Sequence, residues 1–214
     1  MSERTDFLYP FIEGEGDDPA ALLADLARSA ESKADESAAL ATATLTACDH
    51  ELDRIATAMA DRLRGGATLF TFGNGGSSTD ADTVAALFAQ PPVGRAFPAR
   101  NLASDPAVLT ALANDVGFDL VFARQLMAHA RPSDIALGIS TSGDSRDVLV
   151  AFAEAKQAGL LTVGLAGYEG GSFATSADVD HCLVVHAASV HRIQETQAVM
   201  SFELWDRIQR LVAR

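Results

Sequence analysis

Two segments of the chain combine glycine with closely spaced hydroxyl side chains. The first runs from Gly73 to Asp80, and the second runs from Ile139 to Ser145. Each follows a short apolar run and precedes a helical pattern, and a helix N-terminus at the end of a buried strand favours an anion. Glycine lets the backbone approach a ligand, and hydroxyls donate hydrogen bonds to phosphate oxygens. Together the segments predict a phosphate ester site, although either alone also fits a tight turn whose Ser or Asp caps the next helix.

The sequence lacks the motifs of other phosphate-binding and hydrolytic classes. It has no GxxxxGK[ST] motif, so it offers no lysine for the β- and γ-phosphates of a nucleotide. Ser78 stands where a dinucleotide fingerprint has its third glycine, and the region about 20 residues further on has Arg95 in place of an acidic ribose partner. No GxSxG elbow supports a serine hydrolase. These absences disfavour a Walker-type hydrolase, an NAD enzyme and a serine hydrolase.

His191 and Glu195 form a possible acid/base pair at the start of the last helical pattern. They lie four residues apart and therefore on one helix face, where an imidazole and a carboxylate can share a proton transfer or position a sugar hydroxyl. The alternative is a solvated ion pair or a carboxylate favoured by the helix dipole. The same helix carries Gln197 within its apolar stripe, where a polar residue either sets register in a helical interface or lies at its edge.

Short apolar runs alternate with helical patterns after Gly65 and Gly66. The runs show no polar alternation, which is typical of strands buried on both faces of a parallel sheet. This order of elements predicts a doubly wound α/β sheet. The expected strands are 67–72, 135–139, 161–165 and 182–185, and the expected helices are 77–89, 105–112, 118–129, 145–158 and 190–212.

The N-terminal region differs from the rest of the chain in composition and in hydrophobic pattern. Residues 1–18 are acidic and aperiodic, so we expect an arm, followed by a single domain over 19–214. From Pro19 to about Arg64 the chain is rich in alanine and carries an apolar helical stripe. The stripe serves either as an oligomerisation surface or as a face that packs on the chain's own sheet. The apolar residues of the arm are Phe7, Leu8, Tyr9 and Phe11, and the stripe consists of Leu45, Cys48, Leu52, Ile55, Met59 and Leu63.

Composition narrows the classes of function. Of 214 residues, 48% are hydrophobic and 21% are charged, with a formal net charge of -13. This balance fits a folded domain, and the acidity disfavours direct binding to nucleic acid or to an anionic membrane surface. Cys48 and Cys182 show no metal or disulfide spacing. Because the sequence shows neither a signal peptide pattern nor a membrane span, we expect a cytoplasmic protein.

Five motifs occur in the order and spacing of one family. Over residues 35–212 the chain resembles sugar isomerase (SIS) domain proteins of the phosphoheptose isomerase type, and the replication initiator-associating protein similar to them. The resemblance implies about five parallel strands flanked by helices, and a homotetramer in which the N-terminal and final helices form a central bundle. The motifs are Gly73-Asn-Gly-Gly-Ser77, Ala113-Asn114-Asp115, Ile139-Ser-Thr-Ser-Gly-Asp-Ser145, Gly167-Tyr-Glu-Gly-Gly171 and Arg192-Ile-Gln-Glu195.

The resemblance also implies a phosphosugar site at a subunit interface. The first loop is expected to contact the sugar or the phosphate, the second loop to cradle the phosphate, and two more distant residues to face the sugar. These residues are Asn74, Gly75 and Ser77 in the first loop, Ser140, Thr141, Ser142 and Ser145 in the second, and Asp115 and Gln194 beside the sugar.

The catalytic positions of the isomerases are not matched. The resemblance places Thr83, Leu87 and Phe202 where those enzymes carry a histidine, a glutamate base and a second histidine. Of the four groups that hold zinc there, only Gln194 is present, so no metal or other cofactor is expected. Aldose-ketose interconversion needs a positioned base and a stabiliser for the enediolate oxygen. The expected function is therefore a phosphosugar-binding protein that acts as a sensor or as an assembly partner of another protein.

Two alternatives accompany this expectation. The first is an active sedoheptulose-7-phosphate isomerase, or a related aldose-ketose sugar-phosphate isomerase, in which His191 and Glu195 supply the acid/base chemistry. The second is a purely structural tetramer with an empty site, which leaves the presence of both serine-rich loops unexplained.

Overall fold

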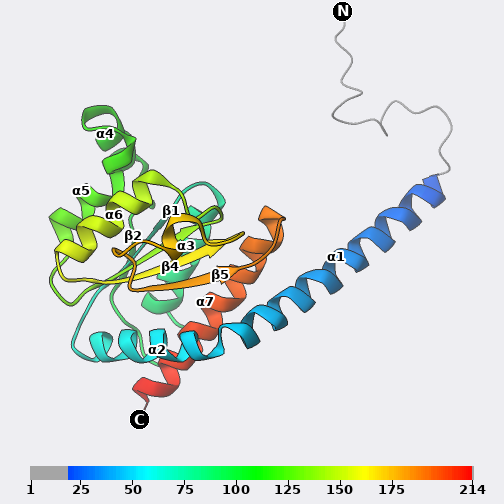
Figure 1. The fold of residues 1–214 in the computed structure, drawn as a ribbon, viewed down its shortest axis with the longest axis horizontal. Helices are drawn as coiled ribbons and strands as arrows, with labels where there is room; N and C mark the ends of the chain where they lie inside the picture. Colours follow the sequence, from blue (N-terminus) through cyan, green and yellow to red (C-terminus); the bar gives the residue numbers. More distant parts are fainter. Residues whose placement is uncertain (1–18, 214) are drawn as a thin grey trace, which may run out of the picture. The chain divides into compact units, whose positions relative to one another are not determined.

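The computed structural model describes residues 19–213. The expected arm over 1–18 lies outside the described residues. The chain divides into two compact units, residues 1–39 and 40–214, and every strand within residues 19–213 belongs to the second unit (Figure 1). The prediction of one domain from residue 19 onward stays a prediction. None of the helices within the described part of the chain has the length and apolar character that a membrane span requires.

A five-stranded parallel sheet forms the centre of the second unit, with the strand order β2-β1-β3-β4-β5 (Figure 1). This order confirms the predicted doubly wound α/β fold. Four strands coincide with the predicted apolar runs. The fifth, β2, has only three residues, of which one is exposed, so it leaves no apolar run in the sequence. The strands are β1 (Leu69–Gly73), β2 (Ala99–Asn101), β3 (Ile135–Ser140), β4 (Leu161–Gly167) and β5 (His181–Val185).

The helices lie close to their predicted positions. The N-terminal helical segment consists of two helices that meet at Cys48, and the pattern over 118–129 divides into a 3-10 helix and an α-helix. The elements are α1 (Pro19–Ala47), α2 (Asp49–Arg64), α3 (Gly76–Ala89), α4 (Pro106–Asp115), η1 (Phe118–Leu120), α5 (Val121–His129), α6 (Arg146–Gln157), η2 (Gly171–Ala174) and α7 (Val190–Val212).

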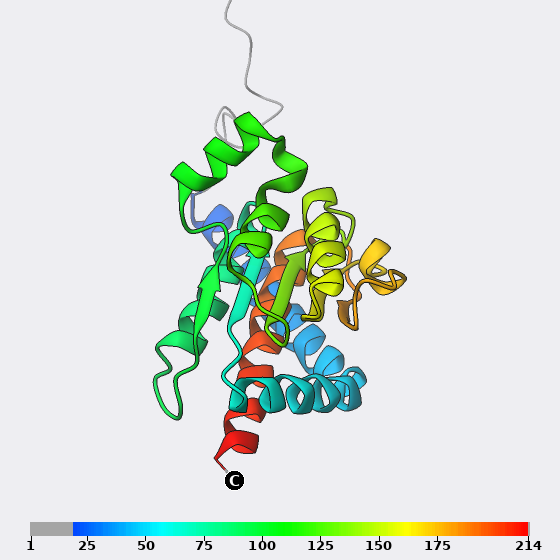
Figure 2. The ribbon, with the colours of Figure 1, turned by 90° about the vertical axis from the view of Figure 1, so that its left-hand side faces the viewer.

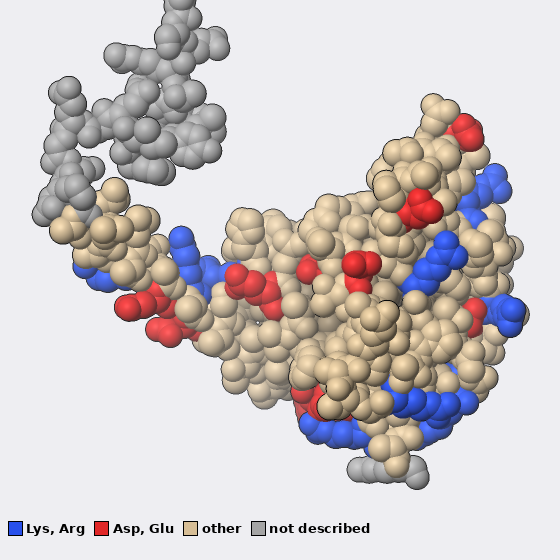
Figure 3. Space-filling model, turned by 180° about the vertical axis from the view of Figure 1, so that it is seen from behind, with Lys and Arg blue, Asp and Glu red and all other residues tan. Residues whose placement is uncertain are grey.

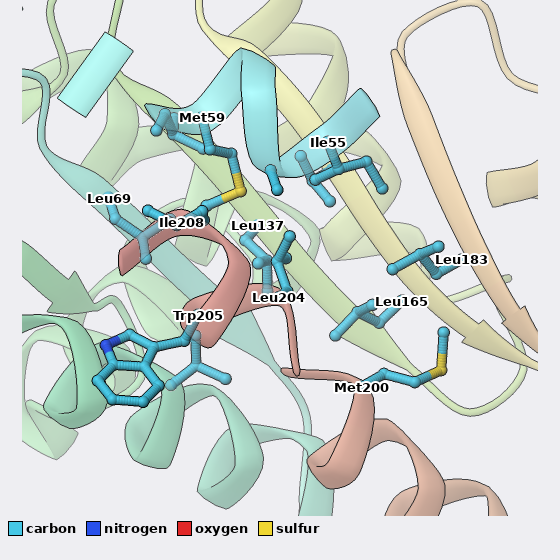
Figure 4. Close-up of a cluster of buried hydrophobic side chains, with 14 of the residues drawn as sticks. Ile55, Met59, Leu69, Leu137, Leu165, Leu183, Met200, Leu204, Trp205 and Ile208 are labelled. Carbon is cyan, nitrogen blue, oxygen red and sulfur yellow. The ribbon is translucent and has the colours of Figure 1, made fainter. Parts of the chain in front are cut away.

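One face of the sheet is covered by α2, α3 and α7. Figure 4 shows Ile55 and Met59 of α2 directed toward Leu137, Leu165 and Leu183 of the strands, with α7 closing the same cluster. The part of the predicted apolar stripe that lies on α2 is therefore buried in the chain's own core. This burial supports packing on the chain's own sheet, rather than an oligomerisation surface, for that part of the stripe. Its buried members are Leu52, Ile55, Met59 and Leu63, while Leu45 and Cys48 are half-buried against the cluster.

The other face of the sheet packs against α5 and α6 through a row of aromatic rings. The centroid of Phe72 lies 5.5 Å from those of both Phe122 and Phe152, and Phe152 meets Phe173 edge to face at 5.1 Å. All four side chains are buried. Aromatic pairs at these separations contribute beyond the burial of their area.

Arg207 joins α7 to α2, which cross in both ribbon views (Figures 1 and 2). Its guanidinium donates hydrogen bonds to the Asp49 carboxylate and carbonyl at 2.7 and 3.0 Å, to Asp53 at 2.7 Å and to Glu203 at 2.8 Å. Partial burial lowers the pKa of Arg207, but these hydrogen bonds raise it more. The contacts hold α2 and α7 together beneath the sheet.

Replacing Asp105 by alanine is expected to cost about 1 kcal/mol of stability, because Asp105 is the N-cap of α4. Its carboxylate accepts hydrogen bonds from the backbone N–H groups of Ala107 at 2.9 Å and Val108 at 3.2 Å, and alanine leaves both donors without this partner. Denaturant unfolding measures the change. Asp35→Ala, in the interior of α1 and also exposed, is the control, and an equal loss in both variants would contradict the capping role.

Candidate functional site

The two glycine- and hydroxyl-containing loops lie next to each other at the carboxyl ends of β1 and β3. These strands are neighbours in the sheet, and Gly73 is paired with Ile139. After β1 the chain forms β2 on one side of β1, and it then crosses over to form β3 on the other side of β1. Such a switch point in strand order is where open α/β sheets bind ligands. A Cβ atom at Gly73 would lie 2.7 Å from the Ile139 carbonyl oxygen, so only glycine fits between the two loops. The two loops that the sequence places at strand ends therefore lie side by side.

Three hydroxyls converge in the second loop. Ser140 Oγ lies 3.0 Å from Ser145 Oγ and 3.3 Å from Ser142 Oγ, and it accepts a hydrogen bond from the Gly143 backbone N–H at 3.2 Å. Ser145 is the N-cap residue of α6, yet its side chain makes no capping hydrogen bond. The hydroxyl cluster, Ser140, Ser142 and Ser145, therefore lies at a helix N-terminus, where neutral donors and the helix dipole favour an anion.

The segment after β4 supports the hydroxyl cluster from one side. Gly143 has a φ of 70°, and a Cβ atom there would lie 2.1 Å from the Gly170 carbonyl oxygen. The backbone N–H and the hydroxyl of Ser172 donate to Asp144 Oδ1 at 2.8 and 2.7 Å. The hydroxyl bond and then the backbone bond hold the pKa of Asp144 below its usual value, although Asp144 is exposed. The geometry of the second loop thus depends on a segment far along the chain.

Replacing Ser172 by alanine is expected to raise the pKa of Asp144, because the hydroxyl that stabilises the charged carboxylate is removed. An NMR titration of the Asp144 carboxyl carbon measures the change. Ser176→Ala is the control, since the Ser176 hydroxyl accepts from the Asp178 N–H. The same Asp144 titration in Ser172→Ala and in the unaltered protein would contradict the assignment.

Asn74 and Asp147 connect the first loop to the start of α6. Asn74 Nδ2 donates to both carboxylate oxygens of Asp147 at 2.9 Å. Asp147 is 4% exposed, and this burial raises the pKa of its carboxyl group, although the hydrogen bonds from Asn74 and from nearby backbone N–H groups oppose the rise. The sequence pattern did not single out Asp147, because its partner lies 73 positions away.

A cavity of about 520 Å³ lies between α3 and α7. Asp80 supplies the one carboxylate among the described residues of its lining, and it accepts a hydrogen bond from Gln194 Nε2 at 3.4 Å. Burial raises the pKa of Asp80, and the Gln194 hydrogen bond partly offsets the rise. Gln194 also reaches the first loop, since a Cβ atom on Gly76 would lie 2.2 Å from Gln194 Nε2. The lining residues are Asp80, Thr83, Val84, Ala86, Leu87, Gln90, Ala198, Ser201 and Phe202.

The structure brings some of the predicted site residues together and separates others. Asp115 is exposed at the end of α4, where it accepts a hydrogen bond from Asn114 Nδ2. His191 and Glu195 are exposed on the first turns of α7, and among the described residues the cavity lining includes neither. The predicted residues gathered around the ends of β1 and β3 are Asn74, Gly75, Ser77, Ser140, Thr141, Ser142, Ser145 and Gln194.

The donor set of the cavity does not fit the zinc site of the resembling isomerases. Thr83, Leu87 and Phe202 line the cavity between α3 and α7, and none of them offers the imidazole or carboxylate that zinc prefers. Within residues 19–213, no group of three or more His, Cys, Asp or Glu side chains is placed to hold a metal ion. That the protein uses no zinc stays a prediction.

Comparisons with known proteins point to one family. Residues 34–167 match the SIS domain family. Phosphoheptose isomerase from Geobacter sulfurreducens is 41% identical over 158 residues, which cover 71% of this chain and 80% of that protein. The corresponding isomerase from Solidesulfovibrio magneticus is 44% identical over 173 residues, covering 77% and 81%. The solved structure of phosphoheptose isomerase from Neisseria gonorrhoeae superimposes with a TM-score of 0.80 at 29% identity, over 86% of this chain and 99% of that chain.

Proposed function

Because the chain belongs to the SIS domain family, we propose that it binds a phosphorylated sugar at the carboxyl ends of β1 and β3. The observation that carries this proposal is the convergence of the hydroxyl cluster at the N-terminus of α6. A phosphate group accepts hydrogen bonds from such hydroxyls and from helix N-terminal amides. The remaining proposed contacts come from Asn74, Gly75 and Ser77 in the first loop, from Thr141 in the second, and from Asp115 and Gln194.

We propose aldose-ketose isomerisation as the reaction of the bound sugar. The support comes from the relatives, which are phosphoheptose isomerases at about 40% identity. The reaction needs a group that accepts a proton from carbon and a donor to the enediolate oxygen. Asp80 suits the first role, since a half-buried carboxylate with a raised pKa is a better proton acceptor at neutral pH than an exposed one, and Gln194 Nε2 beside it can donate.

His191 and Glu195 remain the pair proposed from the sequence for the same role. Both lie on the exposed side of α7. They would take part if a second copy of the chain completes the site in a homotetramer, as the family resemblance implies.

A second candidate function is phosphosugar binding without turnover, in a sensor or an assembly partner of another protein. The observation that favours it is the lining of the cavity between α3 and α7, where Thr83, Leu87 and Phe202 cannot transfer protons. The partner proposed is a protein in the cytoplasm, with no direct contact to nucleic acid. The net charge of -13 supports this choice, and acidic and basic side chains are interspersed over the face of the second unit seen in Figure 3.

One experiment separates the two candidates. Binding of sedoheptulose 7-phosphate is followed by thermal unfolding, and its conversion is followed by an isomerase assay with and without added zinc. A ligand at a hundred times its Kd stabilises a folded protein by about 2.7 kcal/mol. We expect the Ser142→Ala variant to lose this stabilisation, because the substitution removes one hydroxyl of the cluster. The Ser176→Ala variant should keep it, because Ser176 lies outside the cluster.

Turnover by the unaltered protein that falls about 100-fold or more in Asp80→Asn would support isomerisation through Asp80. A fall in Glu195→Gln, with Asp80→Asn unaffected, would assign the chemistry to the sequence-derived pair instead. Stabilisation without turnover in either zinc condition would favour the sensor or assembly role. If millimolar sedoheptulose 7-phosphate shifts the unfolding temperature of neither the unaltered protein nor the Ser142→Ala variant, the proposed binding itself is overturned.

A further inference from the structure

The contact between Asn74 and Asp147 determines which polar group of the Asn74 side chain faces a ligand. Asn74 Nδ2 lies 2.9 Å from both carboxylate oxygens of Asp147. A side-chain amide has a nitrogen that donates and a carbonyl oxygen that accepts, whereas an ionised carboxylate only accepts. The nitrogen must therefore face Asp147, and the acceptor Oδ1 is the group left for other partners.

Asp147 is held firmly enough to impose this orientation. It is 4% exposed, in the first turn of α6, where the helix dipole favours a negative charge. Backbone N–H groups of Asp147 and Val148 donate to its carboxylate, and the nearby Asp119 carboxylate repels it. Burial of a carboxylate is costly without such hydrogen bonds, so release of Asn74 Nδ2 from Asp147 would be unfavourable.

Asn74 lies on the loop that faces the hydroxyl cluster. Its strand, β1, pairs with β3, and the cluster begins at the last residue of β3. The cluster offers donors, which suit phosphate oxygens, whereas Asn74 Oδ1 offers an acceptor, which suits a hydroxyl group. The two loops thus present complementary chemistry to the two parts of a sugar phosphate.

We propose that Asp147 is a positioning residue that orients Asn74 as an acceptor, so that the site selects phosphate esters carrying a free hydroxyl over phosphate alone. This inference rests on the proposed phosphosugar binding. A matched hydrogen bond to a hydroxyl contributes about tenfold in affinity. The measure of selectivity is the Kd of inorganic phosphate divided by the Kd of sedoheptulose 7-phosphate, because a change in charge near the phosphate affects both constants and cancels in the ratio.

The test is a double-mutant cycle on the full chain with Asp147→Asn, Asn74→Ala and the double variant, each titrated with both ligands by calorimetry. Asp147→Asn keeps the shape of the side chain but allows the Asn74 amide to reverse. We expect Asn74→Ala to lower the selectivity ratio about tenfold. Asp147→Asn should lower it by about twofold or more, because only part of the population then presents Asn74 Oδ1. The double variant should lower it no further than Asn74→Ala, since Asp147 acts through Asn74. Thermal unfolding monitors the fold, and Asn74→Ala, which leaves Asp147 unchanged, provides the second variant if Asp147→Asn is unstable.

An unchanged ratio in Asp147→Asn, or effects of the two substitutions that multiply in the double variant, would overturn the inference while leaving phosphosugar binding intact. An unaltered protein that binds inorganic phosphate with no preference for the sugar phosphate would also overturn it. If the unaltered protein binds neither ligand, the proposed function fails, and the inference fails with it.

Discussion

Gly143→Ala is expected to abolish the stabilisation of the protein by a phosphosugar. Gly143 has a φ of 70°, which costs an alanine about 1–2 kcal/mol. The added Cβ would also lie 2.1 Å from the Gly170 carbonyl oxygen and 2.7 Å from its carbon. Both are backbone atoms, so the two loops must move apart. This movement breaks the bond from the Gly143 N–H to Ser140 Oγ and disperses the hydroxyl cluster.

The measurement is the shift of the unfolding temperature with and without sedoheptulose 7-phosphate. Gly66→Ala is a matched control, because Gly66 has a φ of 88°, has no atom within 4 Å of the added Cβ and lies after α2, outside the two loops. It should lose about 1–2 kcal/mol of stability from backbone strain alone and keep its ligand response. A ligand response in Gly143→Ala equal to that of the unaltered protein would show that the second loop does not depend on its contact with Gly170.

Phe152→Ala is expected to lower the free energy of unfolding by about 3–5 kcal/mol, a large share of the stability of one domain. Phe152 has no exposed surface and lies in the middle of the aromatic row, 5.5 Å from Phe72 and 5.1 Å from Phe173. A Cβ at Gly138 would lie 2.6 Å from its ring, which shows how closely the strand and α6 approach there. Removal of the ring leaves a cavity that rigid neighbours on both sides cannot fill.

Denaturant unfolding of the full chain gives this value. Phe118→Ala is the matched control, because Phe118 is 55% exposed, and a change of about 0.5 kcal/mol or less is expected there. Losses of equal size in the two variants would contradict the central place of Phe152 in the core.

The sequence was sufficient for most elements of the fold, because their patterns are local. The strand predicted over 135–139 is found at Ile135–Ser140, and the helix predicted over 190–212 is found at Val190–Val212. A strand buried on both faces must be apolar throughout, so it can be recognised from neighbouring residues alone. β2 was not predicted, because it is a short strand at the edge of the sheet, where Arg100 remains exposed and no apolar run is required.

The two candidate loops were also predictable, since glycine and hydroxyl residues between a strand and a helix form a pattern within a few positions. The zinc and catalytic positions were compared only through the family resemblance. The pattern does not single out Asp147, because an aspartate in the first turn of a helix is common and fits simple stabilisation by the dipole. It does not single out Asp80 either, because the partner of Asp80, Gln194, lies 114 positions away.

The sequence by itself determined the doubly wound α/β class, the position of the two loops at strand ends and the acidic character of the chain. Only the tertiary structure decided that Asp147 faces Asn74, that Asp80 accepts a hydrogen bond from Gln194, and that His191 and Glu195 lie outside the lining of the cavity between α3 and α7. The partners in the first two pairs are 73 and 114 positions apart. Local patterns record which residues a helix or strand must bury, whereas contacts between distant polar groups depend on how those elements pack together.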